Sequence, residues 1–338
     1  MDQLTPVVVT AGPGEPTSRS QSIRGRAAWI VSGVLAAALL YWSLRGIEWQ
    51  RFFQTIAAAR WKYVVLSASV TSSTFFLRAA RWRILLNAAG KFPLGVVFWA
   101  NMAGYLGNNF LPARAGELVR TVLISSRSAL SKTFVLTTAL AERLMDVIAV
   151  ILSASLALSG VQPKPVWMTS LSAALLAGAI AAIVAVALLP RFETPIQRLM
   201  AALPGPRKLR DFLKSLCGEV IVGFRAFHDP RRLAGFALLT VIVWGLDACA
   251  LIVTAHALGL TLTFPVAVLL LTGLALGSSL PSTPGYVGIY QFVAVTVLPP
   301  FGIAKDEALA FIVVSQAVGY LVVLAFGGFG FYRLRRGD

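Results

Sequence analysis

The chain of 338 residues has few cysteines, few histidines and few acidic side chains. Its two cysteines, Cys217 and Cys249, provide neither a disulfide framework nor a metal-binding spacing. The sequence also has no Walker loop, no H-E-x-x-H motif and no G-x-S-x-G elbow. Those patterns are typical of nucleotide-driven machines, zinc proteases and serine hydrolases. We therefore expect no cofactor, no metal and no enzymatic activity.

Long hydrophobic runs dominate the chain instead. Hydrophobic residues make up 57% of it and charged residues 13%, and the mean hydropathy is +0.76. This composition is typical of a protein that crosses the membrane several times. The net charge of +16 comes from basic residues between the hydrophobic runs, where such residues set orientation and contact anionic lipids of the inner leaflet. Since no basic block sits on a soluble domain, we expect no nucleic-acid binding.

The distribution of polar residues predicts the domain organisation. Segment 1–24 is rich in Pro, Gly, Ser and Thr, and we expect it to be a disordered cytoplasmic N-terminus. Residues 25–338 are predicted to form a single all-α domain, a polytopic membrane helix bundle. Arginines precede the run 27–44 and follow the run 308–332, so we expect both termini to be cytoplasmic. The basic segment at about 191–232 has apolar residues at helical spacing, and is either an amphipathic helix on the inner leaflet or a linker helix packed against the bundle.

Two hydrophobic segments are interrupted by proline and glycine. The first, YLGNNFLPARAGELVR at 105–120, breaks at Pro112, and the second, ALGSSLPSTPGYVGIYQ at 275–291, breaks over 281–288. Paired interruptions in the two halves of a chain point to the substrate site of a transporter. The positive-inside count predicts that one segment enters from inside and the other from outside. The sequence therefore predicts two broken or re-entrant segments that form an inverted repeat.

Other hydrophobic runs predict spans that cross the membrane directly. A cluster of basic residues follows the run 61–77 and is interpreted as a cytoplasmic loop. That cluster contains Arg78, Arg81, Arg83 and Lys91. The remaining predicted spans are 132–158, 166–189 and 233–258.

Arg114 lies where the first broken segment resumes as a helix. The free N–H groups of a helix start favour an anion, and a guanidinium offers paired donors that match a phosphate. Asn108 and Asn109 add uncharged donors beside it. Two interpretations remain open: Arg114 binds the phosphate of a lipid headgroup, or it pairs with Glu117 and holds the turn.

The span after the first break carries three charges in the stretch AERLMD. Glu142 and Asp146 share a helix face, and Arg143 can neutralise Asp146. Charged residues inside a span normally face the bundle interior, where they pair or function. These three form either the polar wall of a substrate cavity or a structural ion cluster between helices. Glu117 and Arg120 are also substrate-binding candidates at the first break. Glu117 either titrates, since burial raises the pKa of a carboxylate, or pairs with Arg120 or Arg143, and we favour the pairing.

The second break is polar but carries no charge. This asymmetry predicts that the first break binds an anion. The second break then either binds a neutral moiety or only opens and closes the pathway. Asp247, near the middle of the span 233–258, either binds a coupling proton or cation or forms hydrogen bonds across helices. The substrate-binding candidates at the second break are Ser278, Ser279, Pro284, Gly285 and Gln291.

The motifs NNFLPARAGELVR and ERLMD, with the later LPSTPGYVG before a final span, resemble the lysylphosphatidylglycerol synthase transmembrane-region family, also called flippase-like. The resemblance covers the chain from roughly Arg45 to its end and implies a lipid flippase in a bacterial inner membrane. The arginine and glutamate of the family's first motif map onto Arg114 and Glu117. The second motif usually ends in a glutamate, where this chain has Gln291. Since the sequence stops at Asp338 without the aminoacyl-transferase domain, we expect no lysine transfer.

The leading hypothesis is therefore a transporter that moves an anionic, phosphate-containing lipid or a polyprenyl-linked amphiphile between leaflets by alternating access. One alternative is a membrane-embedded transferase that acts on a lipid phosphate, with Glu117 or Glu142 as general base. Another is a non-transporting membrane partner of a lipid- or envelope-synthesis enzyme.

Overall fold

The computed structural model describes residues 33–111, 115–128, 130–159, 166–188, 195, 227, 229–278 and 284–336. Every regular element in these ranges is an α-helix or a short 3-10 helix. This confirms the predicted all-α fold. The segment 1–24 and most of the segment 191–232 lie outside the described residues, as do Arg114 and Ser279.

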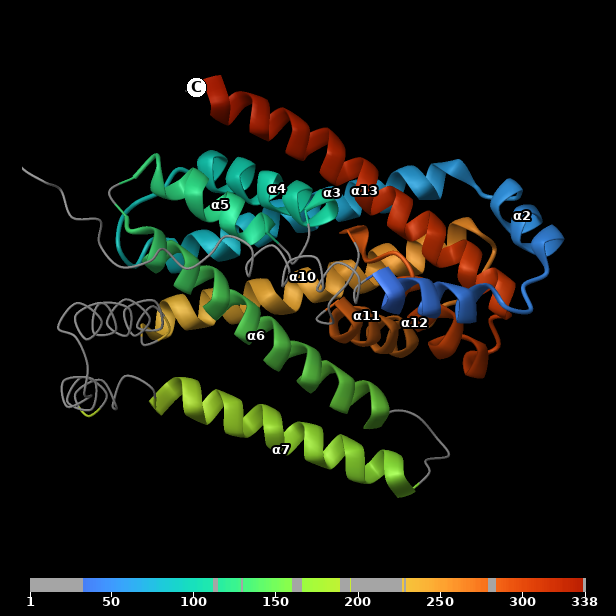
Figure 1. The fold of residues 1–338 in the computed structure, drawn as a ribbon. Helices are drawn as coiled ribbons and strands as arrows, with labels where there is room; N and C mark the ends of the chain where they lie inside the picture. Colours follow the sequence, from blue (N-terminus) through green and yellow to red (C-terminus); the bar gives the residue numbers. More distant parts are fainter. Residues whose placement is uncertain are drawn as a thin grey trace, which may run out of the picture.

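The helices form an elongated bundle (Figure 1), in which the long helix α10 runs through the middle. In chain order they are Gly33–Leu44, α2 (Trp49–Ala57), α3 (Trp61–Leu86), α4 (Leu94–Phe110), α5 (Gly116–Ser125), α6 (Lys132–Ser159), α7 (Val166–Leu188), α10 (Pro230–Ala257), α11 (Phe264–Ser278), η4 (Pro284–Tyr286), α12 (Ile289–Val297), η5 (Pro299–Phe301) and α13 (Lys305–Arg336).

By length and composition alone, two of the described helices could cross a bilayer. They are Pro230–Ala257 and the part Lys305–Gly330 of α13. Large apolar side chains on both helices point away from the bundle, among them Leu238 and Val241 on α10 and Leu321 on α13. An apolar outer surface of this kind is typical of helices that face acyl chains. The helices α3 and α6 have comparable lengths, but they carry the charged residues described below.

Both predicted interruptions are present. The helix α4 ends at Phe110 and α5 begins at Gly116, while α11 ends at Ser278 and α12 begins at Ile289. The four helices have 17, 10, 15 and 9 residues, fewer than the roughly 20 that a transmembrane helix needs. The helices α4 and α5 pack against each other as one hairpin, and α11 and α12 pack against each other as a second hairpin. The prediction of two broken segments is confirmed.

Glycines bring the two helices of each hairpin close together. A Cβ atom at Gly107 of α4 would lie 2.9 Å from the Cα of Gly116 in α5. In the second hairpin, a Cβ at Gly273 or Gly277 of α11 would lie 2.8 Å or 2.7 Å from the side chains of Val293 or Ile289. Small residues at helix crossings are typical of packing within membranes, where close van der Waals contact stabilises association.

Helices in the first and second halves of the chain make corresponding contacts. The helices α3 and α10 pack along each other, α3 contacts α4 and α10 contacts α11. The hairpins also exchange partners, because α4 packs against α13 and α11 packs against α6. An inverted repeat would produce such a pattern of contacts, and the inverted repeat stays a prediction.

The hydrophobic interior is divided into two clusters. One joins α2, the second half of α10, the second hairpin and α13, and includes Leu270 and Phe311. The other joins α3, α4, α5, α6 and the first half of α10, and includes Trp82 and Phe236. The two hairpins accordingly lie toward opposite ends of α10 (Figure 1). This leaves the middle of the bundle for polar side chains.

The predicted end of the second span is wrong. The helix α3 continues from Trp61 to Leu86 without interruption, so Arg78, Arg81 and Arg83 belong to the helix rather than to a cytoplasmic loop. Arg81 is fully buried. The positive-inside rule misassigned these arginines because it counts basic residues and does not consider their partners.

The hairpin α4–α5 should depend on the absence of a side chain at Gly107. We expect Gly107→Ala to lower the stability of the folded protein by about 1–3 kcal/mol, because the added methyl forces α5 away from α4. The matched control is Gly95→Ala on the same helix, where a Cβ meets nothing within 4 Å. Thermal unfolding in detergent should separate the two variants. Equal melting temperatures would contradict the close approach.

Candidate functional site

Six charged side chains form a closed ring of ion pairs. Arg81 contacts Glu142 at 2.9 Å and Asp146 at 2.7 Å. Arg120 contacts Glu142 at 3.1 Å and Glu117 at 2.5 Å. Arg143 closes the ring through Glu117 at 2.8 Å and Asp146 at 3.8 Å. Every arginine therefore contacts two carboxylates, and every carboxylate contacts two arginines.

The ring is assembled by three helices and held by neutral neighbours. The helix α3 supplies Arg81, α5 supplies Glu117 and Arg120, and α6 supplies the other three members. The Arg120 guanidinium also donates to Asn101 Oδ1 at 2.9 Å and lies 4.4 Å from the ring centroid of Trp82. The Arg81 guanidinium donates to Thr240 Oγ1 at 3.2 Å. Aromatic and hydrogen-bonding neighbours of this kind offset part of the cost of removing a guanidinium from water.

The positive and negative charges within the ring balance, and this balance indicates a structural role. Three positive and three negative groups neutralise one another, and Arg81, Arg120 and Glu142 are almost inaccessible to solvent. Buried charges are tolerated when they are paired and hydrogen-bonded. The arrangement therefore ties α3, α5 and α6 together. Its most exposed members are Arg143 and Glu117, and two members, Arg143 and Asp146, also line the cavity described next.

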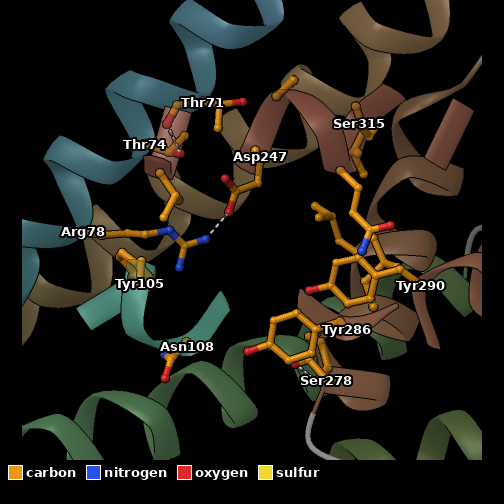
Figure 2. A pocket seen from close by; sticks show the side chains of 18 of the residues that line it. Thr71, Thr74, Arg78, Tyr105, Asn108, Asp247, Ser278, Tyr286, Tyr290 and Ser315 are labelled. Carbon is orange, nitrogen blue, oxygen red and sulfur yellow. Dashed lines mark hydrogen bonds and ion pairs between the residues drawn. The ribbon is translucent and has the colours of Figure 1, made fainter. Parts of the chain in front are cut away.

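A cavity of about 400 Å³ lies in the middle of the bundle, between the two hairpins. Its walls come from α3, α4, α6, α10, α11, α12 and α13 and from the 3-10 turn η4. Figure 2 shows Arg78 and Asp247 on one side of the space and Tyr286 and Tyr290 on the other. The Arg78 guanidinium forms an ion pair with the Asp247 carboxylate, which links α3 to α10.

Several polar atoms of the cavity wall are buried without a protein partner. They are Asn108 Oδ1 of α4, Trp244 Nε1 of α10 and Ser315 Oγ of α13. A buried polar atom that lacks a partner is unfavourable, and in native proteins such an atom commonly binds a ligand or an ordered water. Three residues of the described cavity wall therefore each carry one buried polar atom without a protein hydrogen bond.

The turn between α11 and α12 is held against α13 by side-chain amides. Gln316 Nε2 donates to the Gly285 carbonyl at 2.9 Å, and the Tyr320 hydroxyl donates to the same carbonyl. Gln291 Nε2 donates to Gln316 Oε1 at 2.6 Å, and Gln291 Oε1 accepts from the Gly288 N–H at 2.7 Å. These bonds fix a turn in which Tyr286 has a positive φ of 60°, a conformation that is strained for a tyrosine. The strained residue faces the cavity.

The structure brings many of the predicted site residues to this cavity. Ser278 lies opposite Asn108 across its lower edge (Figure 2). Pro284 and Gly285 form the adjoining turn, and Gln291 reaches the wall through Gln316. The predicted residues that line the cavity are Asn108, Asn109, Arg143, Asp146, Asp247 and Ser278.

Other predicted residues belong to the ion-pair ring rather than to the wall. The expected pairing of Glu117 with Arg120 or Arg143 is confirmed, since Glu117 contacts both. Glu142 is enclosed between helices together with Arg120, so for Glu142 the geometry supports the interpretation as part of a structural ion cluster. Asp247 bonds across helices, to Arg78. Within the described residues, no group of three or more His, Cys, Asp or Glu side chains could hold a metal ion.

Sequence reasoning missed Arg78 and Arg81 as site residues. Counting the charges in the predicted spans would have indicated that cations from another helix were needed. Asp247 has no cation on its own span, and Glu142 and Asp146 share a helix with a single arginine, Arg143. The unmatched carboxylates required cations from another helix, and the arginines that follow position 77 were available.

Comparison with known proteins adds one finding to this geometry. A sequence model described as the lysylphosphatidylglycerol synthase TM region matches residues 29–327. The matched range includes both hairpins, the ion-pair ring and the whole cavity wall. No curated protein matches the chain.

Proposed function

The chain belongs to the lysylphosphatidylglycerol synthase TM region family, and from this premise we propose that it moves a phosphate-containing amphiphile between the two leaflets of a membrane. It is a membrane protein by family and by its apolar helices. The substrate in this proposal is a membrane lipid or a polyprenyl-linked lipid. The headgroup enters the central cavity, and the hydrocarbon chains stay in the surrounding bilayer.

The observation that carries the proposal is the polar cavity between the two broken segments. Ionisable residues within a membrane bundle are costly and commonly mark a substrate pathway. The volume of about 400 Å³ lies in the lower part of the range of roughly 300–1,000 Å³ for small-molecule sites. Such a volume suits a headgroup without its acyl chains.

The rim of the cavity supports this division between headgroup and tails. Val147 of α6 and Leu276 of α11 both line the cavity, yet they are 43% and 51% exposed. Apolar side chains at the edge of a polar cavity can contact acyl chains, while the interior contacts the headgroup. Arg114, which the sequence offers as a phosphate contact, lies outside the described residues, and no part of this proposal depends on it.

Movement between leaflets requires the cavity to open alternately to both sides. The exchanged packing of α4 on α13 and α11 on α6 supports rocking of one half against the other, as in transporters built from repeats. The proposal places the protein in a bacterial inner membrane, with both termini in the cytoplasm. Anionic lipids of the inner leaflet then contact the basic residues between spans.

The membrane-embedded transferase is the weaker alternative. It needs Glu117 or Glu142 as a general base, but each of these carboxylates contacts two arginines. Both carboxylates are occupied by these ion pairs, and neither lines the cavity in which a substrate would have to meet a general base. No observation in the described residues favours the non-transporting partner.

The test is translocation of a fluorescent phospholipid in liposomes that contain the purified protein. The proposal predicts rapid loss of leaflet asymmetry in these liposomes and slow loss in protein-free ones. Mass spectrometry of the lipids should find them chemically unchanged. A modified lipid would support the transferase. If neither glycerophospholipid nor polyprenyl-phosphate probes are translocated, and the protein copurifies from native membranes with a stoichiometric partner, the non-transporting partner role would be supported.

A further inference from the structure

The ion pair between Arg78 and Asp247 stands outside the closed ring. Both side chains line the cavity and are 17% exposed. The two charged ring members that line the cavity, Arg143 and Asp146, are each engaged by two opposite charges. Arg78, by contrast, has a planar guanidinium with five donors and contacts the single carboxylate of Asp247. Within the described cavity wall, this pair is the one that a guest can exchange most easily.

The wall facing this pair is aromatic and neutral. Tyr286 and Tyr290 are stacked, with ring centroids 5.2 Å apart and an interplanar angle of 9°. Figure 2 shows them across the open space from Asp247. Above them lies Ser315, whose hydroxyl has no protein partner. The faces of aromatic rings attract cations, including the ammonium groups of ligands. The cavity therefore offers a carboxylate and two tyrosines to a cation, and a guanidinium to an anion.

Charge balance discriminates among possible headgroups. The four charged residues of the described wall, Arg78, Arg143, Asp146 and Asp247, sum to zero. A purely anionic headgroup that binds Arg78 brings a second negative group beside Asp247 and takes away its partner. A purely cationic headgroup that binds Asp247 brings a second positive group beside Arg78 and takes away the partner of Arg78. Leaving a buried charge without its partner is strongly unfavourable.

We propose that the transported headgroup is zwitterionic, with its phosphate on Arg78 and its ammonium between Asp247 and the tyrosine pair. This inference rests on the proposed function and names the substrate class of the same cavity. A zwitterion exchanges one ion pair for two, so no charge in the wall loses its partner. A neutral polyol leaves the Arg78–Asp247 pair closed and gains no ionic contact.

The test compares two fluorescent lipids with identical acyl chains in reconstituted liposomes, one with a phosphoethanolamine headgroup and one with a phosphoglycerol headgroup. We expect the wild type to move the zwitterionic lipid at least about tenfold faster than the anionic lipid, because the wrong headgroup leaves a buried charge unpaired. Asp247→Asn should reduce this preference toward unity. The matched control is Asp229→Asn at the N-cap of the same helix, where asparagine caps as well as aspartate, and it should keep the preference.

A measurement on the wild type alone guards against misfolding of the variant. Soluble phosphoethanolamine should inhibit translocation of the zwitterionic lipid, whereas glycerol 3-phosphate at the same concentration should not. The inference would be overturned by equal rates for both lipids, by faster movement of the anionic lipid, or by an unchanged preference in a folded Asp247→Asn protein. None of these outcomes would contradict the proposed transport function. Movement of neither lipid would remove the proposed function for glycerophospholipids, and the inference with it.

Discussion

Glu142→Gln is expected to destabilise the folded protein by about 3–5 kcal/mol, the range for breaking a buried ion pair by removing one partner. The Glu142 carboxylate is 2% exposed and holds Arg81 and Arg120 at once. The amide has nearly the same shape but no charge, so the ring would contain three arginines and two carboxylates. The excess positive charge would sit between α3, α5 and α6. Thermal unfolding in detergent should show a large fall in the melting temperature and loss of monodisperse protein.

Two further variants make this result specific to the ring. Arg232→Gln breaks an exposed pair with Asp229 at 3.3 Å and should cost less than about 1 kcal/mol. The double variant Arg81→Met with Glu142→Gln restores equal numbers of positive and negative groups, and Arg120, Glu117, Arg143 and Asp146 remain linked in a chain. It should be more stable than Glu142→Gln alone. A single variant as stable as the wild type would show that the ring does not hold the helices together.

The broken segments could be predicted from the sequence because their cause is local. Pro112 cannot continue a helix, and the residue before a proline avoids helical geometry. In the second break, Gly285 and Gly288 have φ of 73° and 90°, which glycine adopts readily. Proline and glycine at corresponding places therefore indicate an interruption without knowledge of the surrounding fold.

The partners of the charged residues could not be predicted in the same way, because they lie on different helices. Arg81 and Glu142 are 61 positions apart, and Arg78 and Asp247 are 169 apart. A sequence pattern covers one helix at a time, so it placed Glu142 and Asp146 toward the bundle interior but assigned the arginines of α3 to a loop. A search for cations to match every carboxylate in a predicted span would have located both arginines.

The amides at the second break show a similar division. The polar, uncharged character of Gln291 was visible in the sequence. Its contact with Gln316 on α13, and the contact of Gln316 with the Gly285 carbonyl, depend on how α13 packs. Gln316 and Tyr320 therefore lay outside every local pattern, although they hold the turn that carries Tyr286.

A tryptophan at Gly319 is expected to abolish translocation without unfolding the protein. Gly319 lines the cavity from α13, and a Cβ at this position would meet nothing within 4 Å. The indole is the largest natural side chain and would occupy the space that the proposal assigns to the headgroup. Because the position lies within a helix, replacing glycine also removes an unfavourable residue from the helix. The expected loss is therefore one of transport rather than of stability.

The control for this effect lies on the same helix. A Cβ atom at Gly328 would also meet nothing within 4 Å, and this glycine is exposed and does not line the cavity. Gly328→Trp makes the same chemical change on the outer surface of α13, where tryptophan can contact lipid. Both variants should purify as monodisperse protein with the melting temperature of the wild type.

The most direct measurement is the translocation rate of a fluorescent phospholipid by Gly319→Trp and Gly328→Trp, side by side in liposomes with equal protein content. If the cavity between the hairpins is the path of the headgroup, Gly319→Trp falls to the rate of protein-free liposomes and Gly328→Trp keeps the wild-type rate. Wild-type rates from a folded Gly319→Trp protein would show that lipid does not pass through this cavity.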